Sequence, residues 1–468
     1  MLFGFDESRN QHLTFSLKVY NFSRSPMLHK LAFSSLLVSF CFVQFIYAQL
    51  QPRQEKLLNG LKILIWTDKQ ADNPKTAKTS VRLRIHSGSA FDLRGKTGMM
   101  ALLADILFPS EQTKKFFRED LEGDIETKCN YDYIEIFISG KSGETLTILE
   151  TLATAITKPA ITKENFDKVR NARLAKLEEL QKDDAYIADV SVAKRLLGEF
   201  PYGRPSEGTV ESLKAIELAD LIFAKDRYLT ADNATLSIRT DLDSDLIYMA
   251  IRRLFGGWRK SDKIIPATFR QPDEPDTNTQ VLEAQSEDLI EARSAARSVA
   301  RNDKNFFAAS VLAKVLTYRI RNQNAQINKE RTLVVHRAHF LPGILISKLS
   351  MPKSSISFQG ESENGFVQNT TETIQTTAKF SLIDLLGEKI TDDEFERAKN
   401  EFLDELNSKP LEELWLDVDT FKLTSVKDEI QKANNVTLED VNKVAEDFKK
   451  KPIVNLIVTK SSVPAKSN

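Results

Sequence analysis

The chain runs twice through a similar order of extended and helical segments, on either side of a stretch that has neither pattern. Residues 261–278 lose all periodicity and gather Pro266, Pro272 and Pro275 among several aspartates. Such a composition is typical of a linker between domains. On both sides of it, short segments with period-two alternation are interleaved with longer segments of helical spacing. The pattern predicts two α+β domains of similar outline and indicates an internal duplication.

Within each half, the individual elements follow from periodicity and turn residues. Asn59-Gly60 between apolar segments predicts a hairpin over residues 56–66. Further strands are expected over 79–89, 131–138, 234–239, 279–283, 332–336, 343–350 and 453–459. Helices are expected over 98–108, 144–157, 163–182, 210–228, 243–255, 306–321, 362–387, 391–407, 425–432 and 438–449.

Length and composition narrow the class of protein. A chain of 468 residues can form two or three domains, each with its own core. A hydrophobic content of 41% with 28% charged residues is ordinary for a soluble globular protein. The net charge is −1 and no basic face dominates, so nucleic acid is not expected as a partner.

The N-terminal residues have the order of a secretory signal peptide. A short basic start at Lys30 precedes an apolar run over 31–46 and then Tyr47-Ala48-Gln49, with a small residue at the candidate cleavage site. We therefore expect a leader over 1–48, with translation starting at Met27, and a secreted or periplasmic protein. The alternative is an uncleaved leader that anchors the chain to a membrane, although the run is short for a spanning helix.

These boundaries divide the rest of the chain into an N-terminal domain over 49–260, the linker over 261–278, and a C-terminal domain over 279–468. With Cys41 in the leader, Cys129 is the one thiol left, so no disulfide framework is expected.

The helix expected over 98–108 has the frame of the zinc motif H-x-x-E-H without its ligands. In that motif two histidines four residues apart bind Zn²⁺, and the glutamate activates a bound water. Here the three positions are Ala101, Ala104 and Asp105. Alanine has no lone pair to donate, so this helix cannot hold a catalytic zinc as the motif does.

The histidines elsewhere offer no replacement. His12 and His29 lie in or before the leader, and His86, His336 and His339 have neither the spacing nor the flanks of a zinc motif. We interpret these last three as ordinary surface or partly buried residues.

Several segments together carry a resemblance to a known family. They are Leu58-Asn59-Gly60-Leu61, the altered zinc helix, Pro201-Tyr202-Gly203-Arg204-Pro205 followed by Gly208-Thr209, Phe255-Gly256-x-Trp258, and Asp393-Glu394-x-Glu396-Arg397-Ala398-Lys399. The chain thereby resembles the insulinase/pitrilysin family of zinc metallopeptidases, which includes the mitochondrial processing peptidase. The resemblance implies two homologous α/β-sandwich domains, each an antiparallel-rich sheet with helices packed on one face, that form half of a clamshell.

The resemblance also assigns the family's functional positions. The first zinc histidine falls on Ala101, the general base on Ala104 and the second histidine on Asp105. The third ligand falls on Glu179, with Glu178 as the neighbouring choice, and a supporting acidic position falls near Ala172. In the second half, the arginine and tyrosine that hold substrate fall on Asn328 and Val335, so that pair is lost as well.

Two further uses of these residues remain open. Asp105 and Glu179 could bind Ca²⁺ or Mg²⁺ with additional oxygen ligands, or could simply be solvated or paired with basic side chains. The strand that follows the zinc helix is an edge strand in relatives and pairs there with substrate backbone; as a weak peptide-binding candidate it comprises Ile125, Glu126, Thr127, Lys128 and Cys129. We interpret Cys129 as a small apolar filler rather than a nucleophile, because no histidine is near it in sequence.

The resemblance implies a catalytically inactive subunit without zinc or another cofactor. It would pair with a zinc-bearing homologous subunit and contribute surface to a peptide-binding chamber. The alternative is a structural or binding protein that kept the fold without any role in proteolysis. An active peptidase with unconventional ligands is the third hypothesis, and no residue set in the sequence supports it.

Overall fold

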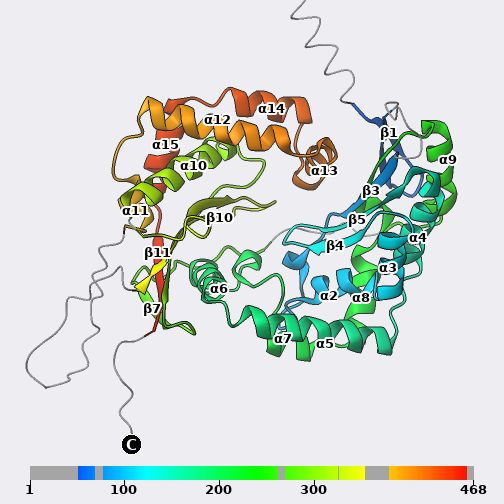
Figure 1. The fold of residues 1–468 in the computed structure, drawn as a ribbon, viewed down its shortest axis with the longest axis horizontal. Coiled ribbons are helices and arrows are strands. Elements are labelled where there is room, and N and C mark those ends of the chain that lie inside the picture. Colours follow the sequence, from blue (N-terminus) through cyan, green and yellow to red (C-terminus); the bar gives the residue numbers. More distant parts are fainter. Residues whose placement is uncertain (1–50, 69–76, 262–268, 325, 354–378, 461–468) are drawn as a thin grey trace, which may run out of the picture. The chain divides into compact units, whose positions relative to one another are not determined.

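A computed structural model describes residues 51–68, 77–261, 269–324, 326–353 and 379–460 (Figure 1). The leader predicted over 1–48 lies outside these residues. Among the described residues, no helix is both long and apolar enough to cross a membrane.

The first half is built on a six-stranded mixed sheet. Its strands are β1 (Arg53–Lys56), β2 (Lys62–Thr67), β3 (Lys78–Ile85), β4 (Ile125–Cys129), β5 (Ile134–Lys141) and β6 (Ala234–Thr240). They lie in the order β1-β2-β6-β3-β5-β4, and only the β2–β6 pair is parallel. The predicted hairpin is confirmed as β1 and β2, and Gly60 in its turn has φ +94°.

Helices cover one face of this sheet because its strands alternate. On β3, Val81, Leu83 and Ile85 are fully buried in a core with the helices, while Arg82 and Arg84 point to the other face. The first-half helices and short 3-10 turns are η1 (Ser89–Phe91), α2 (Met99–Ile106), α3 (Glu111–Glu119), η2 (Ser142–Glu144), α4 (Thr145–Thr157), α5 (Lys163–Leu180), α6 (Asp184–Leu197), η3 (Pro201–Gly203), α7 (Val210–Ala215), α8 (Leu218–Tyr228), η4 (Ala231–Asn233) and α9 (Ser244–Phe255).

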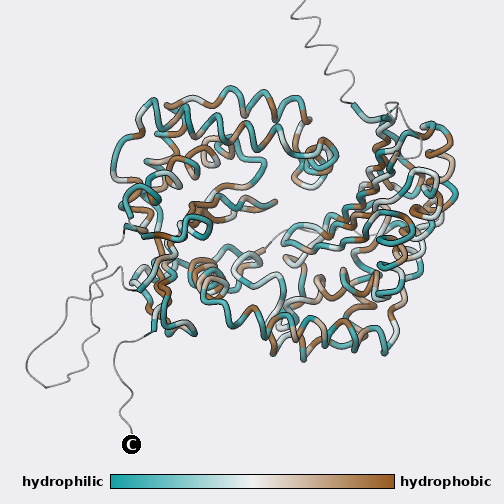
Figure 2. Tube along the Cα trace, in the orientation of Figure 1, coloured by the Kyte–Doolittle hydropathy of each residue, from teal (hydrophilic) through white to brown (hydrophobic). Residues whose placement is uncertain are grey.

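The second half repeats this plan with five strands. They are β7 (Gln280–Glu283), β8 (Leu289–Arg297), β9 (Leu333–Arg337), β10 (Ile344–Pro352) and β11 (Ile453–Thr459), in the order β7-β11-β8-β10-β9. The helices are α10 (Phe306–Gln323), α11 (Leu382–Leu386), α12 (Asp392–Ser408), α13 (Leu411–Phe421), α14 (Val426–Asn434) and α15 (Leu438–Lys449). Figure 2 shows apolar stretches along the strands of both sheets. The α+β fold class is therefore confirmed.

One helix of each half packs on the sheet of the other half. Helix α6 contacts β8 and β11, and it forms an apolar core with them through residues such as Val192 and Val454. Helix α13 contacts β6, and its Glu412 pairs with Arg239 on that strand. Each sheet is thus sandwiched, and residues 52–468 form one compact unit.

Apart from 3-10 turns, the elements that were not predicted are α3, α6, β8 and α13, and the helix predicted over 210–228 is two helices, α7 and α8. Of the helix predicted over 362–387, only Leu382–Leu386 is seen as helix, and residues 354–378 lie outside the described part. Residues 269–279 contain no helix or strand.

Candidate functional site

Helix α2, which the zinc-motif frame predicts, begins at a tightly constrained turn. Its N-cap Gly98 has φ +92°, and a Cβ there would lie 2.8 Å from the Glu207 carbonyl oxygen and 2.9 Å from Gly208 Cα. Gly208 itself has φ +91°. Two glycines in the left-handed region therefore allow the loop of the Pro-Tyr-Gly-Arg-Pro segment to approach the start of α2.

A buried carboxylate completes this helix start. Asp92 accepts hydrogen bonds from the backbone N–H groups of Gly98 (2.7 Å) and Met100 (2.8 Å). These donors would otherwise be unsatisfied at the first turn of α2. Burial of Asp92 raises the pKa of its carboxyl to about 7, although the two backbone donors act in the opposite direction.

An arginine occupies the place that the resemblance gives to zinc ligands. Ala101 and Ala104 are buried, and Asp105 is partly exposed. Arg173 on α5 donates to Asp105 Oδ2 from Nε (2.9 Å) and Nη2 (2.6 Å), and to the Ala101 carbonyl oxygen (3.3 Å). The side chain of Arg173 is only 10% exposed. A fixed positive charge therefore stands against the face of α2 where the family motif carries a cation.

The structure does not join Glu179 to this face. The Glu179 carboxylate pairs with Lys182 at 2.7 Å, and both side chains are mostly exposed. Glu178 and Ala172 are exposed too. In the described part of the chain, no three His, Cys, Asp or Glu residues are grouped so that they could hold a metal ion. Of the two uses left open for Asp105 and Glu179, pairing with basic side chains is the one that these contacts match.

Arg173 is not among the predicted site residues, because the family positions carried over to this part of α5 are acidic ones. Arg173 directly follows Ala172, the position assigned to a supporting acidic residue. A basic residue next to the lost acidic position, together with an aspartate in place of the second histidine, could have predicted an ion pair between α5 and α2.

Strand β4 lies beside this site as the last strand of its sheet. Cys129 at its end donates a weak hydrogen bond to the Asn130 carbonyl oxygen (3.4 Å). Burial, with a smaller contribution from the charge of Asp92, raises the pKa of the Cys129 thiol well above its ordinary value. A protonated thiol is a poor nucleophile, which fits the interpretation of Cys129 as a filler.

In the second half, Asn328 and Val335, which stand where the family has its arginine and tyrosine, have structural roles. Asn328 Oδ1 accepts from the backbone N–H groups of Glu330 (3.1 Å) and Arg331 (3.2 Å), which shapes the loop before β9. Val335 pairs with Ile346 in the sheet and packs against the core shared with α6. Val335 has no donor, and the Asn328 amide oxygen is engaged by its own loop.

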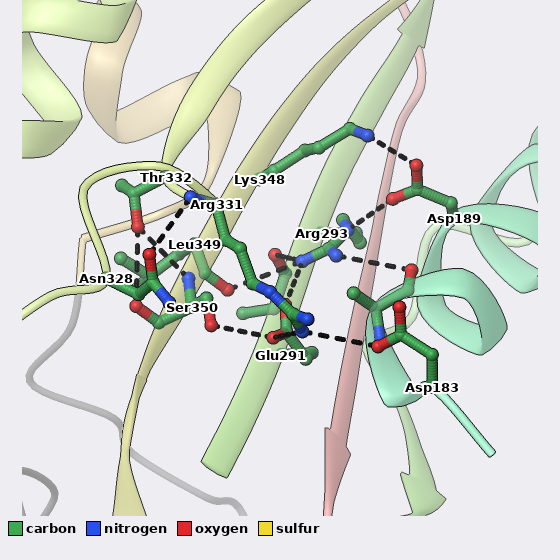
Figure 3. Close-up of polar contacts among 12 residues, drawn as sticks. Asp183, Asp189, Glu291, Arg293, Asn328, Arg331, Thr332, Lys348, Leu349 and Ser350 are labelled. Atoms are coloured by element: carbon green, nitrogen blue, oxygen red, sulfur yellow. Dashed lines mark hydrogen bonds and ion pairs between the residues drawn. The ribbon is translucent and has the colours of Figure 1, made fainter.

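A buried charge network lies next to this loop (Figure 3). Arg293 is 2% exposed and donates to Asp189 (2.7 Å) on α6 and to Glu291 (3.0 Å). Glu291, 1% exposed, also accepts from the Ser350 hydroxyl (2.6 Å). Arg331 reaches Asp183 at 3.2 Å. The network ties α6 to the sheet of the other half.

The three remaining histidines lie in separate networks. His86 contacts Thr235 and Thr420, and His336 contacts the Ser310 hydroxyl (3.0 Å), with a pKa that burial lowers to about 3. His339 Nδ1 lies 2.8 Å from Asp132, which also accepts from the Tyr202 hydroxyl (2.7 Å). None of these networks brings two histidines to one candidate metal position.

Known proteins share part of this sequence and the fold. Residues 215–402 match a family model described as the peptidase M16 inactive domain. No curated protein sequence matches the chain. Among solved structures, the peptidase M16 inactive domain from Pseudomonas fluorescens is similar, with a TM-score of 0.72 and 17% identity over 89% of this chain and 100% of that one.

Two other structures share the fold. A protease from Helicobacter pylori has a TM-score of 0.72 and 16% identity over 87% of this chain and 100% of its own. The periplasmic protease PqqL from Escherichia coli has a TM-score of 0.65 and 14% identity over 89% of this chain and 48% of its own.

Over residues 215–402 the chain is a homologue of the M16 inactive domain. The chain shares the fold of M16 peptidase structures over most of its length, and its α2 carries alanines and an aspartate at the positions of the zinc motif.

Proposed function

We propose that the chain is a non-catalytic subunit that pairs with a zinc-bearing homologue and contributes peptide-binding surface. The observation that carries this proposal is the contrast between the two parts of the site. The metal position on α2 is filled by the Arg173–Asp105 pair, whereas the adjacent strand β4 keeps a free edge.

The free edge of β4 has a defined set of backbone groups. Asn130 N–H donates to Tyr133 O, and Ser139 N–H donates to Asp124 O, so the even-numbered residues of β4 face β5. The backbone N–H and C=O groups of Ile125, Thr127 and Cys129 then point away from β5, and the Ile125 N–H already donates to Asp124 Oδ1 (2.8 Å). Within the described residues no strand pairs with this side. Such an edge can accept an extended peptide by strand addition.

Length supports a partner chain. This chain aligns with 48% of PqqL, and a second chain of the same fold would supply the other half of such an assembly. We further propose that both chains are exported, from the leader at 1–48 and the periplasmic location of PqqL.

The test is reconstitution with a zinc-bearing homologue encoded in the same genome. We expect this chain alone to cleave no peptide, and its addition to raise the partner's cleavage rate at least about tenfold. Thr127→Pro removes an outward N–H and is expected to abolish the increase, while Thr127→Val keeps it. A partner that is fully active alone, and does not bind this chain in gel filtration, would refute the proposal.

The second candidate is a structural or binding protein without a role in proteolysis. The observation in its favour is the loss of the substrate-holding pair at Asn328 and Val335, whose side chains serve the loop and the core instead. Stable association with a partner, without any effect on its cleavage rate, would support this candidate.

A further inference from the structure

Two adjoining cavities lie between β1, β2, α13 and the loops around η1 and residues 339–342. One has a volume of about 270 Å³ and the other about 130 Å³, and both are lined by His86 and Lys422. The larger cavity is rich in lysine, whereas one wall of the smaller cavity is aromatic.

The larger cavity carries an excess of positive charge. Its walls include Lys56, Lys62, Lys260 and Lys422 against two aspartates, Asp232 and Asp419. Both aspartates already have protein partners. Asp419 accepts from the Thr235 hydroxyl (2.9 Å) and pairs with Lys62, and Asp232 accepts from the backbone N–H of Ser261 (2.9 Å).

The other three lysines of this cavity are available to a ligand. Lys56, Lys260 and Lys422 are exposed and make no hydrogen bond or ion pair with other described residues. Lys422 follows the last turn of α13 and has φ +55°. These ammonium groups can therefore bind an anion without first breaking an internal ion pair.

The smaller cavity offers an apolar surface. Its apolar wall consists of Phe91, Phe269, Phe340, Leu341, Ala90 and the ring of Tyr202. Asp132, Asn233 and Thr420 also line it, and the Asp132 carboxylate is engaged by Tyr202 and His339. Phe91 and Phe269 are in edge contact, with ring centroids 5.9 Å apart. Aromatic walls of this kind bind another ring or a short apolar chain.

The His86 ring lines both cavities, and one of its two nitrogen contacts cannot be a hydrogen bond. Its Nε2 lies 3.0 Å from Thr235 Oγ1, and its Nδ1 lies 3.1 Å from Thr420 Oγ1. Both hydroxyl hydrogens are already directed elsewhere, to Asp419 and to the Leu416 carbonyl oxygen. A neutral imidazole carries one N–H only, so it cannot donate to both threonines. Only one of the two His86–threonine contacts can therefore be a hydrogen bond, and the ring is held by that one bond.

We propose that the two cavities form one site for a carboxylate that bears an apolar group of about one aromatic ring. The carboxylate binds among Lys422, Lys260 and Lys56, and the apolar group lies against Phe91, Phe340 and Leu341. A free aryl or alkyl acid and the C-terminal residue of a peptide share this chemistry. The site does not depend on a partner subunit or on peptide cleavage.

Calorimetric titration of the full chain tests the site with matched probes. They are 3-phenylpropionate, 3-phenylpropanol, acetate, and a short peptide ending in phenylalanine with either a free carboxylate or a carboxamide. We expect 3-phenylpropionate to bind at least tenfold more tightly than the alcohol or acetate. Binding of the free-carboxylate peptide but not its amide assigns the site to peptide C-termini, and binding of phenylpropionate alone assigns it to free acids.

Lysine variants complete the test. Lys422→Gln and Lys260→Gln are expected to weaken phenylpropionate binding at least fivefold each, whereas Lys443→Gln on the exposed face of α15 leaves it unchanged. Unchanged circular dichroism spectra establish that the variants fold. Equal affinities for acid and alcohol, or for phenylpropionate and acetate, overturn the proposal, as does the absence of binding to every probe.

Discussion

Arg173 holds the Asp105 carboxylate through two hydrogen bonds of 2.9 and 2.6 Å on the helix face where the M16 motif carries its metal ligands. This helix face therefore differs from the motif by an added positive charge as well as by its missing ligands. A guanidinium that is 10% exposed repels any divalent cation at this position and also cross-links α2 to α5.

The first prediction concerns this pair. Asp105→Ala leaves the Arg173 guanidinium largely buried with one carbonyl contact, so we expect a loss of about 1–3 kcal/mol in the free energy of unfolding. Adding Arg173→Met removes the stranded charge, so the double variant should lose less than the sum of the two single changes. Urea unfolding measures all three variants. Glu179→Ala, which breaks an exposed pair, is the control and should cost less than about 0.5 kcal/mol. Equal losses for Asp105→Ala and Glu179→Ala would contradict the prediction.

The second prediction concerns the start of α2. Gly98→Ala adds a Cβ 2.8 Å from a backbone oxygen at a residue with φ +92°, so strain and overlap should together cost about 2–4 kcal/mol. Two other glycines separate these effects. Gly95→Ala meets nothing within 4 Å but has φ +75°, and Gly143→Ala has neither problem. Thermal unfolding should rank the variants Gly98, Gly95, Gly143 from most to least destabilised, and a Gly98 variant as stable as the Gly143 variant would refute the packing argument.

The third prediction is a pH dependence that originates at Asp92. Its carboxyl has a pKa of about 7 in the folded chain and about 4 in an unfolded one. Because the folded pKa is the higher, the contribution of Asp92 to stability is complete below about pH 4 and is lost as the pH rises to about 7. Asp92→Asn lacks this titration. The unfolding free energy of the wild type minus that of the variant should therefore fall from pH 4.5 to pH 8. A carbon-13 carboxyl resonance of Asp92 that titrates near pH 4 would exclude this origin.

The fold was predictable where local pattern and tertiary environment agree. The Asn59-Gly60 hairpin and α2 follow from a turn dipeptide and an apolar run, and both are present. Strand β8 was missed because Glu291 and Arg293 interrupt its apolar run, although both are buried at its centre. Their charges are compensated by residues distant in sequence, such as Asp189, and local patterns do not register such partners.

Helices α6 and α13 were missed for a related reason. Each packs on the sheet of the other half, so the partners that fix it lie far along the chain. Trp415 on α13, for example, is in edge contact with Trp66 on β2, with centroids 6.3 Å apart. At the site, the absence of the zinc ligands could be predicted from the sequence alone. The Arg173–Asp105 pair could not, because it depends on how α5 packs on α2.

The fourth prediction addresses the buried network between the halves. Arg293→Met leaves Glu291 with the Ser350 hydroxyl and a more distant Arg331 (3.7 Å), so a buried carboxylate loses its main partner. We expect a loss of about 3–5 kcal/mol in unfolding free energy. Adding Glu291→Gln should restore part of it, because the unpaired charge is then absent. Arg270→Met breaks a pair that is about 85% exposed and is the control, with little expected change. If Glu291→Gln raised the unfolding free energy equally in the wild-type background, its effect would not depend on Arg293, and the prediction would be contradicted.

The fifth prediction concerns the reactivity of Cys129. Because burial raises the pKa of its thiol, little thiolate is present at neutral pH, and native Cys129 should react with iodoacetamide at least about tenfold more slowly than in denaturant. Mass spectrometry of the peptide that contains Cys129 measures the rate. The matched control is Lys128→Cys in a Cys129→Ser background, which places a thiol at a side chain that is 74% exposed on the same strand and should react rapidly. Fast labelling of native Cys129 at pH 7 would instead reveal an activated thiol beside β4, and would reopen the case for cysteine chemistry at this site.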